Sequence, residues 1–259
     1  MTRPSTAPPP TRAAGSPADL LPLLYDPDQS YGWSAGMRAV TRALLARVDL
    51  PQGPLLEIGC GGAQLLTELA TDCPLHRVYG VDVHPLALAR AQARLNGHAA
   101  LIRAPLQRLP WPDATFALVL ALDVFDQTGV DLTAALAESY RLLAPGGSLL
   151  LRLSAHPRLY GPHDVAFHTG RRYARRQIVT ALHGAGFTVT RATYANITLG
   201  GPVAALRLLQ RARLAPWSPA PYRNRLANVV AAWLLRREAA WLRHADLPVG
   251  LSLCVIAEK

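Results

Sequence analysis

The sequence predicts an α/β fold in which helices cover both faces of a mainly parallel sheet. Short apolar runs at 54–59, 78–82, 100–103 and 116–122 alternate with amphipathic segments. Strands alternating with helices in this way build parallel sheets that are buried on both faces. The 259 residues, 50% of them hydrophobic, suffice for one large core. We therefore expect a disordered leader over 1–17 and one domain over 18–259.

The first apolar run ends in a glycine-rich turn. Residues 55–63 read Leu-Leu-Glu-Ile-Gly-Cys-Gly-Gly-Ala, and a helical pattern follows from about Gln64. Glycines allow a sharp turn and close approach to a ligand, to which the helix offers its first amides. The pattern predicts a nucleotide-type cofactor. A dinucleotide fingerprint would need glycine at Gln64, and a P-loop would need Lys before Ser or Thr, so both are disfavoured.

A second acidic signal follows at the end of the next run. Residues 78–82 read Val-Tyr-Gly-Val-Asp, which places Asp82 at the end of the second expected strand. A carboxylate at this distance from the glycine turn can accept hydrogen bonds from a ribose diol. Leu-Pro-Trp-Pro-Asp at 109–113 and Leu-Ala-Pro-Gly-Gly at 143–147 precede the fourth run and a fifth one at 148–153.

With these four signals in order, residues 50–155 resemble the class I S-adenosylmethionine (SAM)-dependent methyltransferases, which include small-molecule "type 11" enzymes. The resemblance implies a Rossmann-like seven-stranded sheet whose last two strands, here 187–194 and 249–257, are an antiparallel pair. It also implies SAM as cofactor and S-adenosylhomocysteine as product. The contacts that it implies to SAM are Tyr31, Glu57, Gly59, Cys60, Gly61, Asp82, Val83, Ala104, Pro105, Leu106 and Leu122.

The sequence departs from the family at two places. Gln127 stands where the family often carries histidine, and Arg103-Ala104-Pro105 lacks the frequent acidic residue near the adenine. If methyl transfer uses a general base, residues in the loops after the strands are the candidates. These candidates are Asp123, Asp126, His163 and His168. Two carboxylates without further spaced ligands are weak support for a metal, and none is expected.

The acceptor-side residues also come from the resemblance. A run from His168 to Tyr173, followed by Tyr194 and Asn196, is similar to the acceptor side of bacterial methyltransferases. The acceptor contacts it implies are Trp33, His168, Arg172, Tyr173, Tyr194 and Asn196. Asp123-Val124-Phe125-Asp126 replaces the Pro-Pro-aromatic run of adenine and cytosine N-methyltransferases. O- or C-methylation of a small, lipophilic metabolite is favoured; the alternatives are RNA methylation and a silent binding or scaffold module.

An insertion of about 196–248 separates the last two expected strands. It has two helical stretches, broken by the Pro-rich residues 216–221. Apolar residues recur at helical spacing in the second stretch, at Leu226, Val229, Val230, Trp233, Leu234 and Trp241. Either this stripe packs on the sheet domain as a helical lid, or, with Arg236, Arg237 and Arg243, it contacts a membrane or a lipid-linked substrate.

Composition limits the partners. The net charge of +10 comes from arginines, with Lys259 the single lysine, and indicates non-specific anion attraction more than a nucleic-acid partner. No apolar run approaches a spanning helix, and the N-terminus lacks a secretory core, so we expect a cytoplasmic protein, or one peripheral to the membrane. The three cysteines, Cys60, Cys73 and Cys254, lack metal-ligand spacing and are expected to be reduced. Oligomeric state is not indicated.

Overall fold

The computed structural model describes residues 32–49, 51–72, 76–97, 99–216 and 224–259. Its seven strands are β1 (Leu55–Ile58), β2 (Val78–Asp82), β3 (Ala99–Arg103), β4 (Phe116–Leu122), β5 (Leu143–Ser154), β6 (Thr188–Ala195) and β7 (Ser252–Glu258). The helices are α1 (Gly32–Leu45), α2 (Gln64–Asp72), α3 (Pro85–Leu95), α4 (Leu132–Leu142), α5 (Pro162–Ala166), α6 (Arg175–Gly184), α7 (Gly200–Arg211) and α9 (Arg225–Leu242), with a 3-10 turn, η2, at Pro157–Leu159. None of the described helices is long and apolar enough to cross a bilayer.

The strands form one sheet in the order β3-β2-β1-β4-β5-β7-β6. β1 to β5 are parallel, and β7 runs antiparallel to both β5 and β6. The predicted seven-stranded, mostly parallel sheet with an antiparallel last strand is confirmed. β5 begins five residues earlier than the predicted 148, because Leu143 already pairs with Phe116 of β4.

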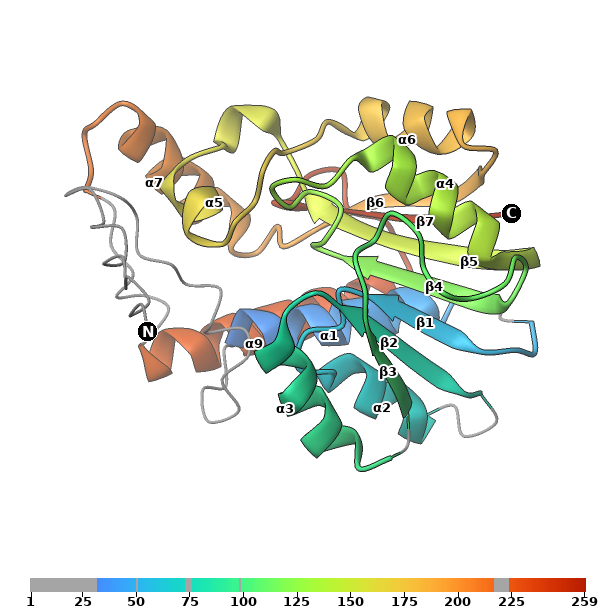
Figure 1. Cartoon of the computed structure of the whole chain (residues 1–259). Coiled ribbons are helices and arrows are strands. Elements are labelled where there is room, and N and C mark those ends of the chain that lie inside the picture. The colour runs from blue at the N-terminus through green and yellow to red at the C-terminus, as the bar shows by residue number, and fades with distance from the viewer. Residues whose placement is uncertain (1–31, 50, 73–75, 98, 217–223) are drawn as a thin grey trace, which may run out of the picture.

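Helices cover both faces of the sheet, as predicted (Figure 1). α4 and α6 lie on one face, where Leu136, Ile178 and Leu182 pack against the apolar side chains of β4 and β5. α1, α2, α3 and α9 lie on the other face, where Met37 and Leu66 belong to a second buried cluster. The central strands β1 and β4 therefore bury both of their sides, which explains why their runs are almost wholly apolar, whereas the edge strands β3 and β6 are partly exposed.

Two glycines allow α1 and α9 to pack in close contact. A Cβ on Gly32 would lie 1.7 Å from the carbonyl oxygen of Asn228, and one on Gly36 would lie 2.4 Å from Cβ of Leu235. The Gly32 N–H also donates to Oδ1 of Asn228, at 2.9 Å. Only glycine fits at such a crossing. The insertion helix α9 is thereby fixed beside the start of α1, at the side of the sheet where the sites described below lie.

The interpretation of the apolar stripe on α9 as a packed face was wrong. Of its six residues, Leu234 is half-buried and the other five are 45 to 72% exposed, whereas Leu235, Ala239 and Leu242 are buried. The side of α9 that packs closely against α1 is the opposite one, which carries Leu235, Ala239 and Leu242. The insertion between β6 and β7 is itself as predicted, with α7 and α9 as its two helices. Most of the predicted break at 216–221, like the leader at 1–17, lies outside the described residues.

Candidate active site

A cavity of about 470 Å³ lies at the carboxyl ends of β1, β2 and β4. Parallel sheets bind their ligands at this edge, because the loops after the strands are free to shape a pocket there. Ten of the eleven predicted cofactor contacts line it, and Tyr31, the eleventh, is outside the described residues. Those ten are Glu57, Gly59, Cys60, Gly61, Asp82, Val83, Ala104, Pro105, Leu106 and Leu122. We call it the first cavity.

The glycine turn forms the floor of the first cavity. Gly59 has φ +71° and Gly61 has φ +53°, a left-handed backbone that other residues adopt at a cost. A Cβ on Gly59 would approach Cγ2 of Val124 to 2.8 Å. The Gly59 and Cys60 amides donate to the Val81 carbonyl, at 2.8 and 3.1 Å. The turn is thus tied to β2, and its shape depends on glycine.

Asp82 joins the glycine turn to the loop after β2. Its Oδ2 accepts a hydrogen bond from the Gly61 amide at 2.9 Å, and its Oδ1 accepts one from the His84 amide at 2.8 Å. A carboxylate offers about four acceptor positions, so each oxygen can still accept from a further donor. The side chain is buried and lines the first cavity. This arrangement suits a ligand that carries a pair of neighbouring hydroxyls.

Glu57 is a buried acid with one oxygen available to a hydrogen-bond donor. Among the described residues its Oε2 has no hydrogen-bond partner, although the side chain is only 6% exposed. Burial, aided by the charge of Asp82 and opposed by that of Arg152, raises the pKa of Glu57 to about 8. A buried acceptor of this kind favours a cationic donor. The ammonium of an amino-acid ligand such as SAM fits both the charge and the missing hydrogen bond.

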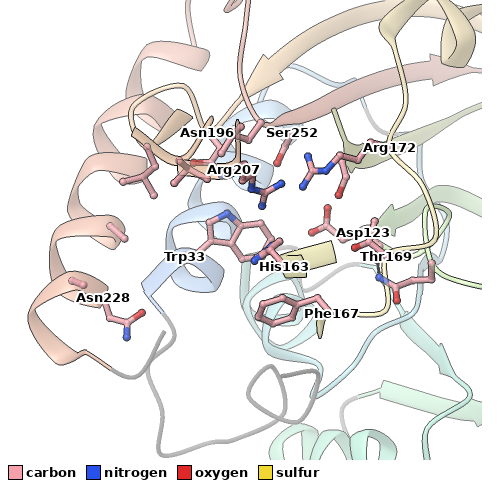
Figure 2. A pocket seen from close by; sticks show the side chains of 17 residues that line it. Trp33, Asp123, His163, Phe167, Thr169, Arg172, Asn196, Arg207, Asn228 and Ser252 are labelled. Atoms are coloured by element: carbon pink, nitrogen blue, oxygen red, sulfur yellow. Dashed lines mark hydrogen bonds between the residues drawn. The ribbon is translucent and has the colours of Figure 1, made fainter. Parts of the chain in front are cut away.

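A second cavity of about 300 Å³ adjoins the first. Trp33, Asp123 and Gln127 line both cavities and therefore mark where they meet. Apolar side chains from four elements or loops dominate the second cavity, namely Phe167, Leu199, Val203, Ala227, Ala231 and Leu251. Figure 2 shows Trp33 and Asp123 near its centre, with Asn228 at the edge formed by α9. A largely apolar molecule placed there would face a ligand in the first cavity.

The polar end of the second cavity carries two arginines and one carboxylate. Arg172 pairs with Asp164 at 2.7 Å, and Arg207 lies 3.7 Å from the same carboxylate. All three side chains are at most 9% exposed. In Figure 2 the two guanidinium groups lie close together beside Trp33. These three groups together carry one net positive charge in a buried place, which favours an acidic or strongly polar ligand group.

Asn196 adds an acceptor to this end. It follows β6, is 5% exposed and lines the second cavity, and its Oδ1 has no hydrogen-bond partner among the described residues. The backbone here is held by Glu238 of α9, whose carboxylate accepts from the Asn196, Ile197 and Thr198 amides. Asn196 is therefore held in place and has an acceptor available for a ligand hydroxyl.

The structure separates the four candidate bases. Asp123 lines both cavities, but its Oδ2 accepts from Nη2 and Nε of Arg152 at 2.6 and 2.9 Å. Asp126 lines neither cavity; it is 1% exposed, its Oδ2 accepts from the Ser154 amide at 2.7 Å, and burial raises its pKa to about 6. His163 lines the second cavity, and His168 lines the first. Burial, together with Arg207 and Arg172, lowers the pKa of His163 well below its usual value.

The predicted acceptor residues are divided in a similar way. Trp33 lines both cavities, and Arg172 and Asn196 line the second. His168 lines the first cavity only. Tyr173 is buried and lines neither cavity, and Tyr194 stacks on His156 with ring centroids 5.2 Å apart. The geometry thus brings three of the six together around the second cavity.

Sequence reasoning missed Arg152, Arg207 and Glu238. Arg152 lies in β5, lines the first cavity, and bonds Asp123 and the Thr41 hydroxyl, with its guanidinium 5.5 Å from the Trp33 ring centre. A lone arginine in an otherwise apolar strand was a signal for it, because such a buried charge needs partners. Arg207 and Glu238 gave no comparable signal, since charged residues in helices are common.

Cys60 and Cys254 are free and buried, and burial raises the pKa of both thiols above the usual value. Cys73 is outside the described residues. Among the described residues no group of three or more His, Cys, Asp or Glu side chains is placed to hold a metal ion.

The fold and the first cavity define an α/β protein with a ligand-sized cavity at the carboxyl ends of its strands, and comparison with known proteins shows what it is similar to. Residues 56–151 match the family model described as a methyltransferase domain. Over these residues the chain is similar to the class I SAM-dependent methyltransferases. The match covers β1 to β5, which carry the glycine turn, Asp82 and Asp123.

Two curated relatives and one solved structure are similar to this chain. Demethylmenaquinone methyltransferase of Thermus thermophilus is 32% identical over 122 residues, which are 46% of this chain and 55% of that protein. Trans-aconitate 2-methyltransferase of Deinococcus radiodurans is 26% identical over 188 residues, 69% of each chain. Geranyl diphosphate C-methyltransferase of Streptomyces coelicolor, solved with Mg²⁺, geranyl diphosphate and S-adenosyl-L-homocysteine, matches with TM-score 0.58 at 15% identity, covering 94% of this chain and 89% of that one.

The match spans about half the length of the first of these relatives. At 15% identity, the likeness to the solved structure shows a common fold.

Proposed function

We propose that this protein transfers the methyl group of SAM to an oxygen or carbon atom of a small, largely apolar metabolite. The observation that carries the proposal is the meeting of the two cavities at Trp33, Asp123 and Gln127. One cavity has the glycine turn, Glu57 and Asp82 that suit SAM, and the other is mostly apolar. A donor and an acceptor placed in adjoining cavities can be held in line for direct transfer.

The residues around the first cavity suit each part of SAM. Asp82 would accept from the ribose hydroxyls, Glu57 would accept from the ammonium, and Ala104, Pro105 and Leu106 would border the adenine. SAM supplies an activated methyl group on a sulfonium, so the protein mainly binds and orients the two reactants. Leu122 and Val124 lie at the cavity wall and would limit water near the sulfonium.

A hydroxyl acceptor must lose its proton when its oxygen is methylated. His163 lines the acceptor cavity and is neutral near pH 7, but burial and the neighbouring Arg207 and Arg172 lower its pKa, so it would take that proton only as a weak base. A carbon acceptor that is already nucleophilic would use the same cavity for orientation, and would lose its proton after the new bond has formed. Trp33, between the cavities, would help to exclude water at the reacting atoms.

The acceptor is proposed to carry an acidic or hydroxyl group at one end of an apolar body. Arg172, Arg207 and Asn196 form the polar end of the second cavity, and apolar side chains form the rest. The names of the related proteins support this class, since demethylmenaquinone, trans-aconitate and geranyl diphosphate are all small acceptors. A volume of about 300 Å³ suits a small molecule better than an extruded RNA base with its flanking chain.

Calorimetry with SAM and S-adenosylhomocysteine tests the cofactor first. Micromolar binding that Asp82→Ala weakens by about 1.5 to 3 kcal/mol, the worth of a hydrogen bond to a charged group, is the expected result. If the protein binds neither ligand, the proposed methyl transfer is wrong, and a binding or scaffold module is the remaining alternative. Methyl transfer from labelled SAM to a panel of prenylated phenols, quinols and carboxylic acids, with a structured RNA included, then tests the acceptor.

Arg207→Gln tests the acceptor cavity separately. It should raise KM for an acidic acceptor at least tenfold and leave SAM affinity unchanged, because Arg207 lines the second cavity and not the first. Arg211→Gln is the matched control: it lies one turn further along α7 and is exposed, with Nη1 donating to the Arg158 carbonyl. Equal effects of the two variants would point to general electrostatics and not to contact with the acceptor.

A further inference from the structure

The outward side of α9 is an apolar strip with no covering element among the described residues. Leu226, Val229, Val230 and Trp233 stand at i, i+3, i+4 and i+7, and Trp241 continues the strip two turns later. Their exposed fractions are 72, 58, 45, 56 and 61%. We call these five residues the α9 strip. Figure 1 shows α9 lying along α1, with its first turns projecting beyond the end of the sheet.

The α9 strip is not the ordinary scatter of apolar residues found on a protein surface. Single exposed apolar side chains need no explanation, but a row along one helix face, interrupted here by Arg237 between the two tryptophans, marks an interaction site. The opposite side of the helix already supplies its packing, through Leu235, Ala239 and Leu242. Two of the five strip residues are tryptophans, which favour the boundary between an apolar phase and water.

Arginines flank the α9 strip, and α9 itself carries no exposed acid; the nearest exposed acid in the sequence, Asp246, is paired with Arg191. Arg225, Arg236, Arg237 and Arg243 are exposed, and Arg237 lies over the ring of Trp233, 5.4 Å from its centre. The one acidic residue of α9, Glu238, is buried and bonded to the backbone at 196–198. An apolar face with a basic border and no acids matches a negatively charged bilayer surface. A second copy of the chain would instead bring arginines against arginines.

We propose that α9 lies in the surface of an anionic membrane, with the α9 strip inserted among the lipids and the four arginines at the headgroups. The same helix links this surface to the second cavity. Ala227, Asn228 and Ala231 line that cavity, while Leu226, Val229 and Val230 on neighbouring positions face outward. A lipophilic acceptor could pass from the bilayer to the cavity along α9. This last step rests on the proposed function, whereas membrane binding does not.

Vesicle flotation with the full chain tests the proposal. The protein should float with vesicles of phosphatidylglycerol and phosphatidylcholine, and far less with phosphatidylcholine alone or in high salt. Trp233→Ala with Trp241→Ala should lower the partition coefficient at least tenfold, and Arg236→Gln with Arg237→Gln should lower it on anionic vesicles by a similar factor. Lipids brominated on the acyl chains should quench the fluorescence of the wild type, and quench the double tryptophan variant much less.

Matched variants control for general effects. Leu86→Ala removes an apolar side chain on α3 that is 45% exposed, and Arg175→Gln with Arg176→Gln removes an exposed arginine pair from α6. Both should float like the wild type. Calorimetry with SAM shows that each variant is folded.

Several outcomes would overturn the proposal. The first is that the wild-type protein binds SAM but does not float with anionic vesicles. The second is that the control variants lose flotation as much as the α9 variants do. A dimer that the tryptophan variant dissociates, without flotation of the wild type, would assign the strip to a second copy instead. If SAM binding itself failed while flotation persisted, the proposed function would fail and the membrane surface would stand.

Discussion

Nη2 of Arg152 lies 2.6 Å from Oδ2 of Asp123, and this pair stands where the two cavities meet. The arginine comes from β5 and the aspartate from the loop after β4, so the contact closes the gap between neighbouring strand ends. Arg152 also bonds the Met37 carbonyl and the Thr41 hydroxyl of α1. A single buried side chain thus holds together three elements that border the first cavity.

Removal of Arg152 should be costly for stability. Arg152→Met leaves Asp123 without its cation and should lower the free energy of unfolding by about 3 kcal/mol. Asp123→Asn adds no backbone cost, because asparagine tolerates the φ of +55° found there, but it leaves the more deeply buried Arg152 without its anion and should cost a similar amount. Denaturant unfolding of both variants and of the double variant measures the coupling. A double variant as unstable as the sum of the single ones would show that the ion pair contributes nothing of its own.

Glu57 should release a proton when SAM binds. Burial raises its pKa to about 8 in the ligand-free protein, so at pH 7 the group is mostly protonated. A cation bound beside it favours the ionised form, so SAM affinity should rise with pH between about 6 and 7.5. Calorimetry in buffers of different ionisation enthalpy counts the released protons. In Glu57→Gln this buffer dependence should vanish; if it persists, another group such as Asp126 releases the proton.

The raised pKa of Glu57 also makes stability depend on pH. SAM affinity should rise with pH, whereas the stability of the ligand-free protein should fall. The folded protein keeps the Glu57 proton from pH 4.5 up to about 8, whereas the unfolded chain has released it. The ligand-free protein therefore loses stability from this group as pH rises through that window. Glu57→Gln removes this dependence. The difference in thermal midpoint between the variant and the wild type should accordingly grow in favour of the variant from pH 5 to pH 8.

The strands of the mainly parallel sheet and the residues around the first cavity could be predicted because their signals are local. The glycine turn, Asp82 and the apolar strands are each written in a few consecutive residues, and ten predicted contacts do line one cavity. Arg207 and Glu238 could not be found in this way. Each acts on residues about forty positions away, with Arg207 beside Asp164 and Glu238 on the backbone at Asn196. Such contacts depend on where the insertion folds back.

The α9 strip shows a different limit. Helical periodicity indicates that one side of a helix is apolar, but not that this side faces the core. Here the inward side is chosen by Gly32 and Gly36 of α1, against which only small or well-placed side chains fit. The orientation of α9 thus depends on two glycines about two hundred residues away in the sequence, and the sequence of α9 alone does not indicate it.

Gly59→Ala should abolish SAM binding while the protein remains folded. Alanine at φ +71° costs about 1 to 2 kcal/mol, and its Cβ would also press on Val124 at 2.8 Å, which forces the turn away from its bound shape. Gly97→Ala is the matched control, since Gly97 has φ +86° with no atom within 4 Å of the new Cβ. Thermal unfolding should show a similar backbone cost in both. If the Gly59 variant binds SAM as tightly as the Gly97 variant, the glycine turn is not part of the SAM site.

Glu238 should govern the acceptor end of the site through Asn196. Its carboxylate accepts three backbone amides at 196–198 and the Thr198 hydroxyl, so Glu238→Gln places an NH₂ donor against donors and should cost about 2 to 3 kcal/mol of stability. Because Asn196 is then no longer held by Glu238, KM for the acceptor should rise, while SAM affinity should stay the same. Asp246→Asn, which breaks the pair between an exposed carboxylate and the largely buried Arg191 but keeps an acceptor for the guanidinium, is the control and should cost less, about 1 kcal/mol. Denaturant unfolding and steady-state kinetics measure the two effects, and an unchanged KM in a clearly destabilised Glu238 variant would restrict Glu238 to a role in stability.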